Sequence, residues 1–167
     1  MTGSCIRLEF RDQLRARSGR LVPRPPGVEV HAAAMLRRRK IYLESALLGN
    51  LGELRRILIH ELFHFVWMRL GNLLRREWEE LLRGEMVAGA RGELGHSAQW
   101  RKQALARSAA CGRSRLWRQY VCESFCDSAA WWFLRPARHE EFTLGKRWRE
   151  RRARWLAHLL DRHALPV

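Results

Sequence analysis

Residues 57–67 read Ile-Leu-Ile-His-Glu-Leu-Phe-His-Phe-Val-Trp, an apolar run that two histidines and one acid interrupt. His60 and His64 are four residues apart, and a helix places such residues one turn apart on the same face. Both imidazoles can then bind one divalent ion, and Glu61 can accept a proton from a water molecule on that ion. Without an ion, burying these three groups among apolar side chains would be costly. The stretch therefore predicts a helix that carries a metal site, with Zn²⁺ as the expected ion.

The sequence before this helix has the pattern of strands, and the sequence after it has the pattern of helices. Strands are predicted over residues 5–11 (half-buried, by its alternation) and over 28–36 and 40–43, around a basic turn. Helices are predicted over residues 51–70, 73–82, 98–110, 114–134 and 144–162, with a loose glycine-rich connection at 84–95. This order predicts an α+β fold in a single domain over residues 1–167: a short N-terminal β-sheet, the metal-site helix and a mainly helical remainder.

Composition indicates a packed globule with an unusual charge. Hydrophobic residues make up 47% of the 167 residues, which argues against disorder, and the formal net charge is +15, nearly all of it from arginine. Such a charge favours contact with a polyanion such as nucleic acid, although arginines spread over solvated faces would give the same total. Residues 146–155 are the densest basic stretch. Trp148 and Trp155 are expected on its core side, with the arginines on its outer face.

The sequence favours a cytoplasmic protein without a membrane span. Residues 1–12 lack the apolar core of a signal peptide, and no stretch is long and apolar enough to cross a bilayer. The four cysteines show no CxxC spacing, which fits a reducing compartment. Cys122 and Cys126 share a helix face; they could bind zinc, but burial as small apolar side chains is the simpler interpretation.

A catalytic zinc ion usually has three protein ligands, so one more is expected outside the pentad. Glu123 and Asp127 stand four residues apart in a segment that is otherwise apolar or small. Two neighbouring carboxylates in such a segment repel each other and are costly to bury without a cation. We expect Glu123 to bind the ion and Asp127 to accept the N–H of a ligand histidine. The alternative is that both acids pair with arginines.

The pattern His60-Glu61-x-x-His64 followed by Glu123-x-x-x-Asp127 resembles the gluzincin metallopeptidases over roughly residues 28–135. The resemblance implies a compact zincin-like fold, zinc bound by the two histidines and Glu123, Glu61 as general base, and a peptide or protein substrate. The strand at 40–44 resembles the edge strand with which compact zincins bind substrate backbone. The transition-state histidine or tyrosine of that clan has no clear match; Tyr120 and His139 are the candidates.

Two further interpretations remain. Residues 95–102, Gly-His-Ser-Ala-Gln-Trp-Arg-Lys, look like a segment of SprT-like proteases, in which His96 would be the third ligand and the substrates would be DNA-linked proteins. That interpretation leaves Glu123 and Asp127 without a role. Alternatively, the chain is a non-enzymatic zinc-binding adaptor whose basic surface holds nucleic acid or a partner.

Overall fold

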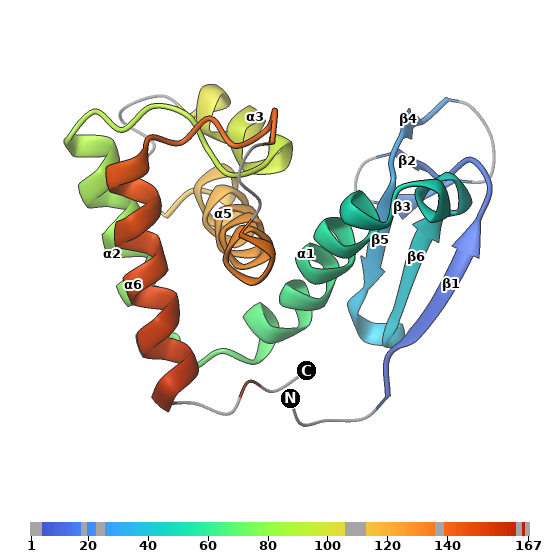
Figure 1. Ribbon diagram of the computed structural model, residues 1–167, viewed down its shortest axis with the longest axis horizontal. Coiled ribbons are helices and arrows are strands. Elements are labelled where there is room, and N and C mark those ends of the chain that lie inside the picture. Colours follow the sequence, from blue (N-terminus) through green and yellow to red (C-terminus); the bar gives the residue numbers. More distant parts are fainter. Residues whose placement is uncertain are drawn as a thin grey trace.

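The computed structural model describes residues 5–17, 20–22, 26–105, 113–135, 139–162 and 165. Within these residues the chain forms a small N-terminal β structure followed by helices, which confirms the predicted α+β fold (Figure 1). None of the described helices is both long and apolar enough to cross a membrane.

Two three-stranded sheets make up the β structure. The strands are β1 (Arg7–Arg11), β2 (Arg15–Arg17), β3 (Arg20–Leu21), β4 (Val28–Glu29), β5 (Ala32–Met35) and β6 (Lys40–Glu44). The larger sheet has the order β1-β6-β5, with β1 parallel and β5 antiparallel to β6; the smaller has the order β3-β2-β4. A short 3-10 helix, η1 (Leu36–Arg38), turns β5 into β6, and Arg39 closes it with a φ of 48°. This confirms two strands around a basic turn, but the strand predicted over 28–36 is divided into β4 and β5, which belong to different sheets.

The position of β6 corrects one expectation from the sequence. The strand at 40–44 was expected at the sheet edge, but β6 is the central strand, hydrogen-bonded on both sides. Its apolar side chains already indicate this, because Ile41, Tyr42 and Leu43 are all buried. The edge strand nearer to the metal-site helix is β5.

The metal-site helix lies between the sheet and the other helices (Figure 1). After the 3-10 helix η2 (Ser45–Gly49), α1 (Leu51–Arg69) begins where the Asn50 side chain accepts a hydrogen bond from the Glu53 N–H. On one side, Ile57 and Phe65 of α1 belong to the core formed with the sheet. On the other side, Phe63 and Val66 belong to the core formed with the helices. Two buried sides explain why the sequence around the pentad is apolar in nearly every direction.

Strand β1 is less buried than its alternating pattern predicts. Leu8 and Phe10 pair with Ile41 and Leu43 of β6, yet their exposed fractions are 48% and 40%. The contacts of α1 with the sheet fall mainly on β5 and β6, so the apolar side chains of β1 remain uncovered at the margin. The prediction of a half-buried strand was therefore wrong in burial but correct in position.

Among the described helices, α5 packs against α1 and in turn contacts the other three that follow α1 in the sequence (Figure 1). The described helices after α1 are α2 (Asn72–Val87), α3 (His96–Ala104), α5 (Arg115–Leu134) and α6 (Lys146–Arg162). α5 begins where Ser114 accepts a hydrogen bond from Trp117 N–H and ends at Arg135, which has a φ of 41°. The predicted helices at 73–82, 114–134 and 144–162 are confirmed in position. The one predicted at 98–110 begins earlier, at His96, and its residues 106–110 lie outside the described part.

A buried ionic cluster, consisting of Arg152, Glu85, Glu93 and Lys102, holds α6 against α2 and the start of α3. Arg152 is 0% exposed and donates hydrogen bonds to the carboxylates of Glu85 and Glu93. Lys102 Nζ lies 2.9 Å from Glu93 Oε1. The segment 84–95 is therefore not loose, and Arg152 does not belong to the outer face expected of the α6 arginines.

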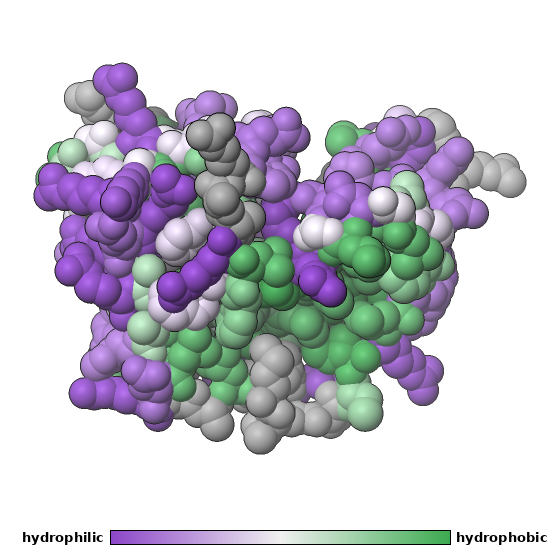
Figure 2. Space-filling view, in the orientation of Figure 1, coloured by the Kyte–Doolittle hydropathy of each residue, from purple (hydrophilic) through white to green (hydrophobic). Residues whose placement is uncertain are grey.

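Most of the other arginines of α6 are exposed, and this side of the molecule is largely hydrophilic where α2 and α6 lie (Figure 2). Trp155 packs against the helical core as predicted. Trp148 is only half-buried and lies outside that core, with the Arg147 guanidinium 4.7 Å from its ring centre.

Candidate metal centre

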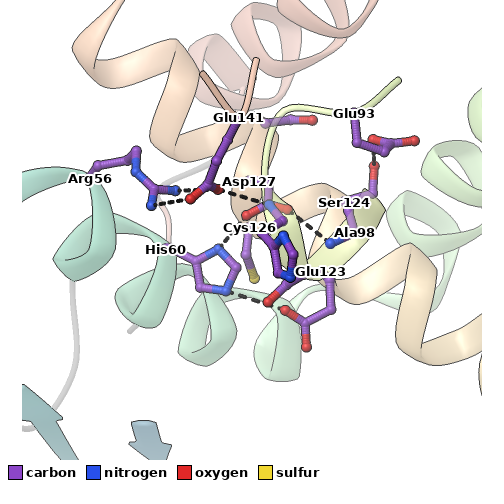
Figure 3. A network of polar contacts seen from close by, with 12 residues as sticks. Arg56, His60, Glu93, Ala98, Glu123, Ser124, Cys126, Asp127 and Glu141 are labelled. Atoms are coloured by element: carbon purple, nitrogen blue, oxygen red, sulfur yellow. Dashed lines mark hydrogen bonds and ion pairs between the residues drawn. The ribbon is translucent and has the colours of Figure 1, made fainter. Parts of the chain in front are cut away.

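Two helices far apart in the sequence supply the side chains of one buried polar cluster (Figure 3). His60 and His64 lie on α1, and Glu123 and Asp127 lie on α5, which packs against it. His60 Nε2 lies 3.3 Å from Glu123 Oε2, and His64 Nε2 lies 4.0 Å from the same oxygen. The structure thus brings together the three side chains that the sequence predicts as metal ligands.

The two separations that involve Glu123 are compatible with one tetrahedral ion, and the Cys126 sulfur also lies within 4.8 Å of ligand atoms from both histidines. Zinc binds nitrogen and oxygen at about 2.0–2.2 Å, which places neighbouring ligand atoms of a tetrahedral site about 3.4 Å apart. The 3.3 Å between His60 and Glu123 meets this value, and the 4.0 Å between His64 and Glu123 requires only a small side-chain movement. Two imidazoles and a carboxylate are also the ligand types that catalytic zinc sites use.

Asp127 fixes the orientation of His60. Its Oδ1 lies 2.7 Å from His60 Nδ1 and, because a carboxylate only accepts, the imidazole donates there and turns its Nε2 toward Glu123. Its Oδ2 accepts the backbone N–H of Ala98 at 3.2 Å. Asp127 is 2% exposed, so two donors satisfy a carboxylate that would otherwise be costly to bury.

Gly95 makes this close approach possible. A Cβ at position 95 would lie 2.2 Å from Asp127 Cγ, a distance at which the carboxylate or the start of α3 would have to move. The backbone there is extended, with a φ of −177°, so space rather than backbone strain requires the glycine.

The ionisable groups of the cluster shift one another's pKa strongly. Burial lowers the pKa of His60, but Asp127, Glu123 and Glu61 outweigh it and raise that pKa well above 6.5. Burial also opposes the charge on His64, whose pKa nevertheless rises to about 9 beside Cys122 and Glu123. Burial raises the pKa of Glu123, but His60, His64 and Arg101 lower it to about 2. Both imidazoles are therefore protonated at neutral pH when no ion balances the acids.

Zinc binding at pH 7 is accordingly expected to release about two protons, one from each imidazole. Because the pKa of His64 is about 9 and that of His60 is raised well above 6.5, the apparent affinity should fall as the pH drops, by up to about a hundredfold per pH unit. Calorimetry in buffers of different ionisation enthalpy measures the proton count. Release of no protons would contradict the protonated state of the cluster.

Glu61 points to open space beside the cluster. It makes no hydrogen bond or ion pair with any residue that the structure describes, although it is only 9% exposed. It lines a cavity of about 250 Å³ with Arg56 and Glu141, and one of about 340 Å³ with residues 32–34 of β5. His60 lines both cavities. A carboxylate in this position can accept a proton from a molecule bound in the groove that the two cavities form.

The remaining candidates lie away from the ligand atoms. Tyr120 is fully buried and donates its hydroxyl hydrogen bond to Glu93 at 2.6 Å, and His139 pairs with Glu53 at 3.1 Å. Neither lines the two cavities beside Glu61. The exposed His96 does line the cavity of about 250 Å³.

Sequence reasoning gave too little weight to two thiols. Cys122 Sγ and Cys126 Sγ each lie 3.5 Å from His64 Nδ1, and the Cys126 sulfur lies within 4.8 Å of ligand atoms from both histidines. A hydrogen bond from Cys126 and the neighbouring His64 lower the pKa of Cys122 to about 6, against the effect of burial. The four-residue spacing of Cys122 and Cys126 on a predicted helix was the feature of the sequence that could have indicated their closeness to each other.

Comparisons with protein-family models, curated proteins and solved structures gave no significant match. The functional interpretation therefore depends on the residues and geometry of this chain.

Proposed function

We propose that this protein is a zinc-dependent metallopeptidase of the gluzincin type, in which His60, His64 and Glu123 bind the ion. The observation that supports this most is the convergence of three ligand atoms beside a groove that the unpaired carboxylate of Glu61 also lines. A structural zinc site would be closed by a fourth protein ligand, whereas a catalytic one keeps a position for water.

The chain's own residues divide the chemistry between them. Bound zinc would polarise the scissile carbonyl and lower the pKa of a water molecule. Glu61 takes the proton from the attacking water and later transfers it to the leaving amine. Asp127 keeps His60 in the tautomer and orientation that ligation requires. His96 lines the cavity and is a candidate donor of a hydrogen bond to substrate.

The exposed edge of β5 is the proposed binding surface for the peptide backbone. The Glu44 N–H donates to the His31 carbonyl, so hydrogen-bonded pairs between β5 and β6 alternate from that position. Ala32 and Ala34 consequently direct their N–H and C=O groups away from β6. These groups border the cavity that Glu61 lines, and an extended substrate can pair with them as an added strand.

Substitution of proline for Ala34 tests this edge. Loss of one outward N–H is expected to lower kcat/KM for peptides by roughly tenfold, with zinc affinity and stability little changed. Ala33→Pro is the matched control: it removes an N–H that faces β6 and should destabilise the fold. Unchanged peptide kinetics in a folded Ala34→Pro protein would exclude β5 as the substrate strand.

The proposed ligand set is tested by comparing Glu123→Ala with His96→Ala. Chelator-sensitive peptide cleavage is expected in the wild type. The zinc affinity of Glu123→Ala should be at least tenfold lower than that of the wild type, whereas the zinc affinity of His96→Ala should be unchanged. The SprT-like alternative requires the reverse result, together with cleavage that DNA stimulates.

A row of cations on α6 favours a second candidate function, binding to a nucleic-acid backbone with or without proteolysis. The exposed residues, spaced three or four apart along one face, are Arg147, Arg151, Arg154, His158 and Arg162. None of the four arginines has an acidic partner among the described residues. Phosphate contacts would make binding sequence-independent and salt-sensitive. Salt-sensitive binding to duplex DNA, without any chelator-sensitive peptide cleavage, would favour this adaptor function.

A further inference from the structure

His64 has two polar sides, and the proposed zinc site uses only one of them. Its Nε2 faces Glu123, whereas its Nδ1 lies 3.5 Å from Cys122 Sγ and 3.5 Å from Cys126 Sγ. The two cysteines stand one helical turn apart on α5, and neither is in a disulfide. Three donor atoms of metal-binding type therefore lie close together at the Nδ1 of this imidazole.

The two nitrogen–sulfur distances are those of a metal site. Zinc binds nitrogen at about 2.0–2.1 Å and sulfur at about 2.3 Å, so the nitrogen and sulfur ligands of a tetrahedral ion lie about 3.6 Å apart. Both nitrogen–sulfur distances, 3.5 Å, agree with this value. Cys126 is fully buried and Cys122 half-buried, so an ion could enter past Cys122.

The contrast with His60 argues against simple packing. A ligand histidine normally donates its second ring N–H to a carboxylate, a carbonyl or water, as His60 does to Asp127. A thiol is a weak hydrogen-bond partner, yet two of them occupy this place beside His64. Soft thiolates together with an imidazole instead suit d¹⁰ ions such as Zn²⁺, Cd²⁺ and Cu⁺.

We propose that His64 Nδ1, Cys122 and Cys126 form a second, thiolate-rich metal site that binds a soft d¹⁰ ion. Binding requires both sulfurs as thiolates and an unprotonated Nδ1. A neutral imidazole offers only one nitrogen lone pair. An ion at Nδ1 therefore leaves Nε2 protonated and competes with the ion held by His60 and Glu123. A soft metal ion would thus inhibit the proposed peptidase by taking one of its ligands.

Titration of the reduced, metal-free protein with Cd²⁺ tests the site through the ultraviolet charge-transfer band of cadmium–thiolate bonds. We expect a one-to-one endpoint in the wild type and at least tenfold weaker binding in Cys122→Ser and in Cys126→Ser. The double variant Cys5→Ser/Cys111→Ser, which keeps only the cysteines of α5, should retain the band, and circular dichroism checks that each variant is folded.

Two further variants separate this proposal from the proposed function. His60→Ala and Glu123→Ala remove ligands of the first site and should leave the cadmium band intact. Loss of the band in His60→Ala, or full binding in folded Cys122→Ser, would overturn the second site. The cadmium band is measured without any peptidase activity. The second metal site can therefore be supported even if the protein cleaves no peptide, and it can be refuted even if the protein is an active peptidase.

Discussion

Replacement of Glu61 by glutamine is expected to lower peptide hydrolysis by roughly 10³-fold while zinc affinity stays close to that of the wild type. Glutamine keeps the size of the side chain and its place in the groove but cannot accept a proton from water. Glu61 makes no hydrogen bond or ion pair with a described residue, so replacing it by glutamine should break no such contact.

The measurement is kcat/KM on a peptide substrate, with the zinc content of each variant determined in parallel. Glu80→Gln, at an exposed acid on α2, is the matched control and should be fully active. His64→Ala should lose both zinc and hydrolysis. Substantial hydrolysis by zinc-loaded Glu61→Gln would refute Glu61 as general base.

Replacement of Arg152 by alanine is expected to lower the free energy of unfolding by about 3–5 kcal/mol. The change would leave Glu85 and Glu93 buried without their main cationic partner. Burial raises the pKa of Glu93, but Arg152 and Lys102 hold it at about 2, so this carboxylate is charged in the folded protein.

Urea unfolding measures this effect, and Arg151→Ala is the control. Arg151 is the exposed neighbour of Arg152 on α6, and its removal should change stability by less than about 0.5 kcal/mol. Equal unfolding midpoints for the two variants would mean that the buried cluster contributes little to stability.

Local patterns predict the elements of this fold well, and they predict which side chains lie together at the candidate metal centre. The HExxH spacing locates α1, and the acids at i and i+4 locate the polar face of α5, because both signals arise within one helix. Their expected proximity is confirmed by the 2.7 Å and 3.3 Å contacts of His60 with Asp127 and Glu123. The identity of the metal and the reaction remain predictions.

Features that depend on which elements become neighbours were harder to predict. The central place of β6 depends on its pairing with β1, which chain order does not reveal. Arg152 resembled its exposed neighbours in composition, although it lies on the stripe of α6 that contains the buried Leu156 and Leu159. Glu85 and Glu93 offset the free-energy cost of burying the Arg152 guanidinium. Both come from a glycine-rich segment of sequence without clear periodicity.

The contact at Gly95 carries an evolutionary consequence. Any side chain at position 95 would collide with the carboxylate that orients His60. A substitution there is therefore tolerated only if the contact between Asp127 and His60 is lost. Glycine at 95 and aspartate at 127 should therefore be inherited or lost together. In sequences that descend from this one, the presence of both residues would indicate that the metal centre is retained, even where the surrounding loops and the α6 arginines differ.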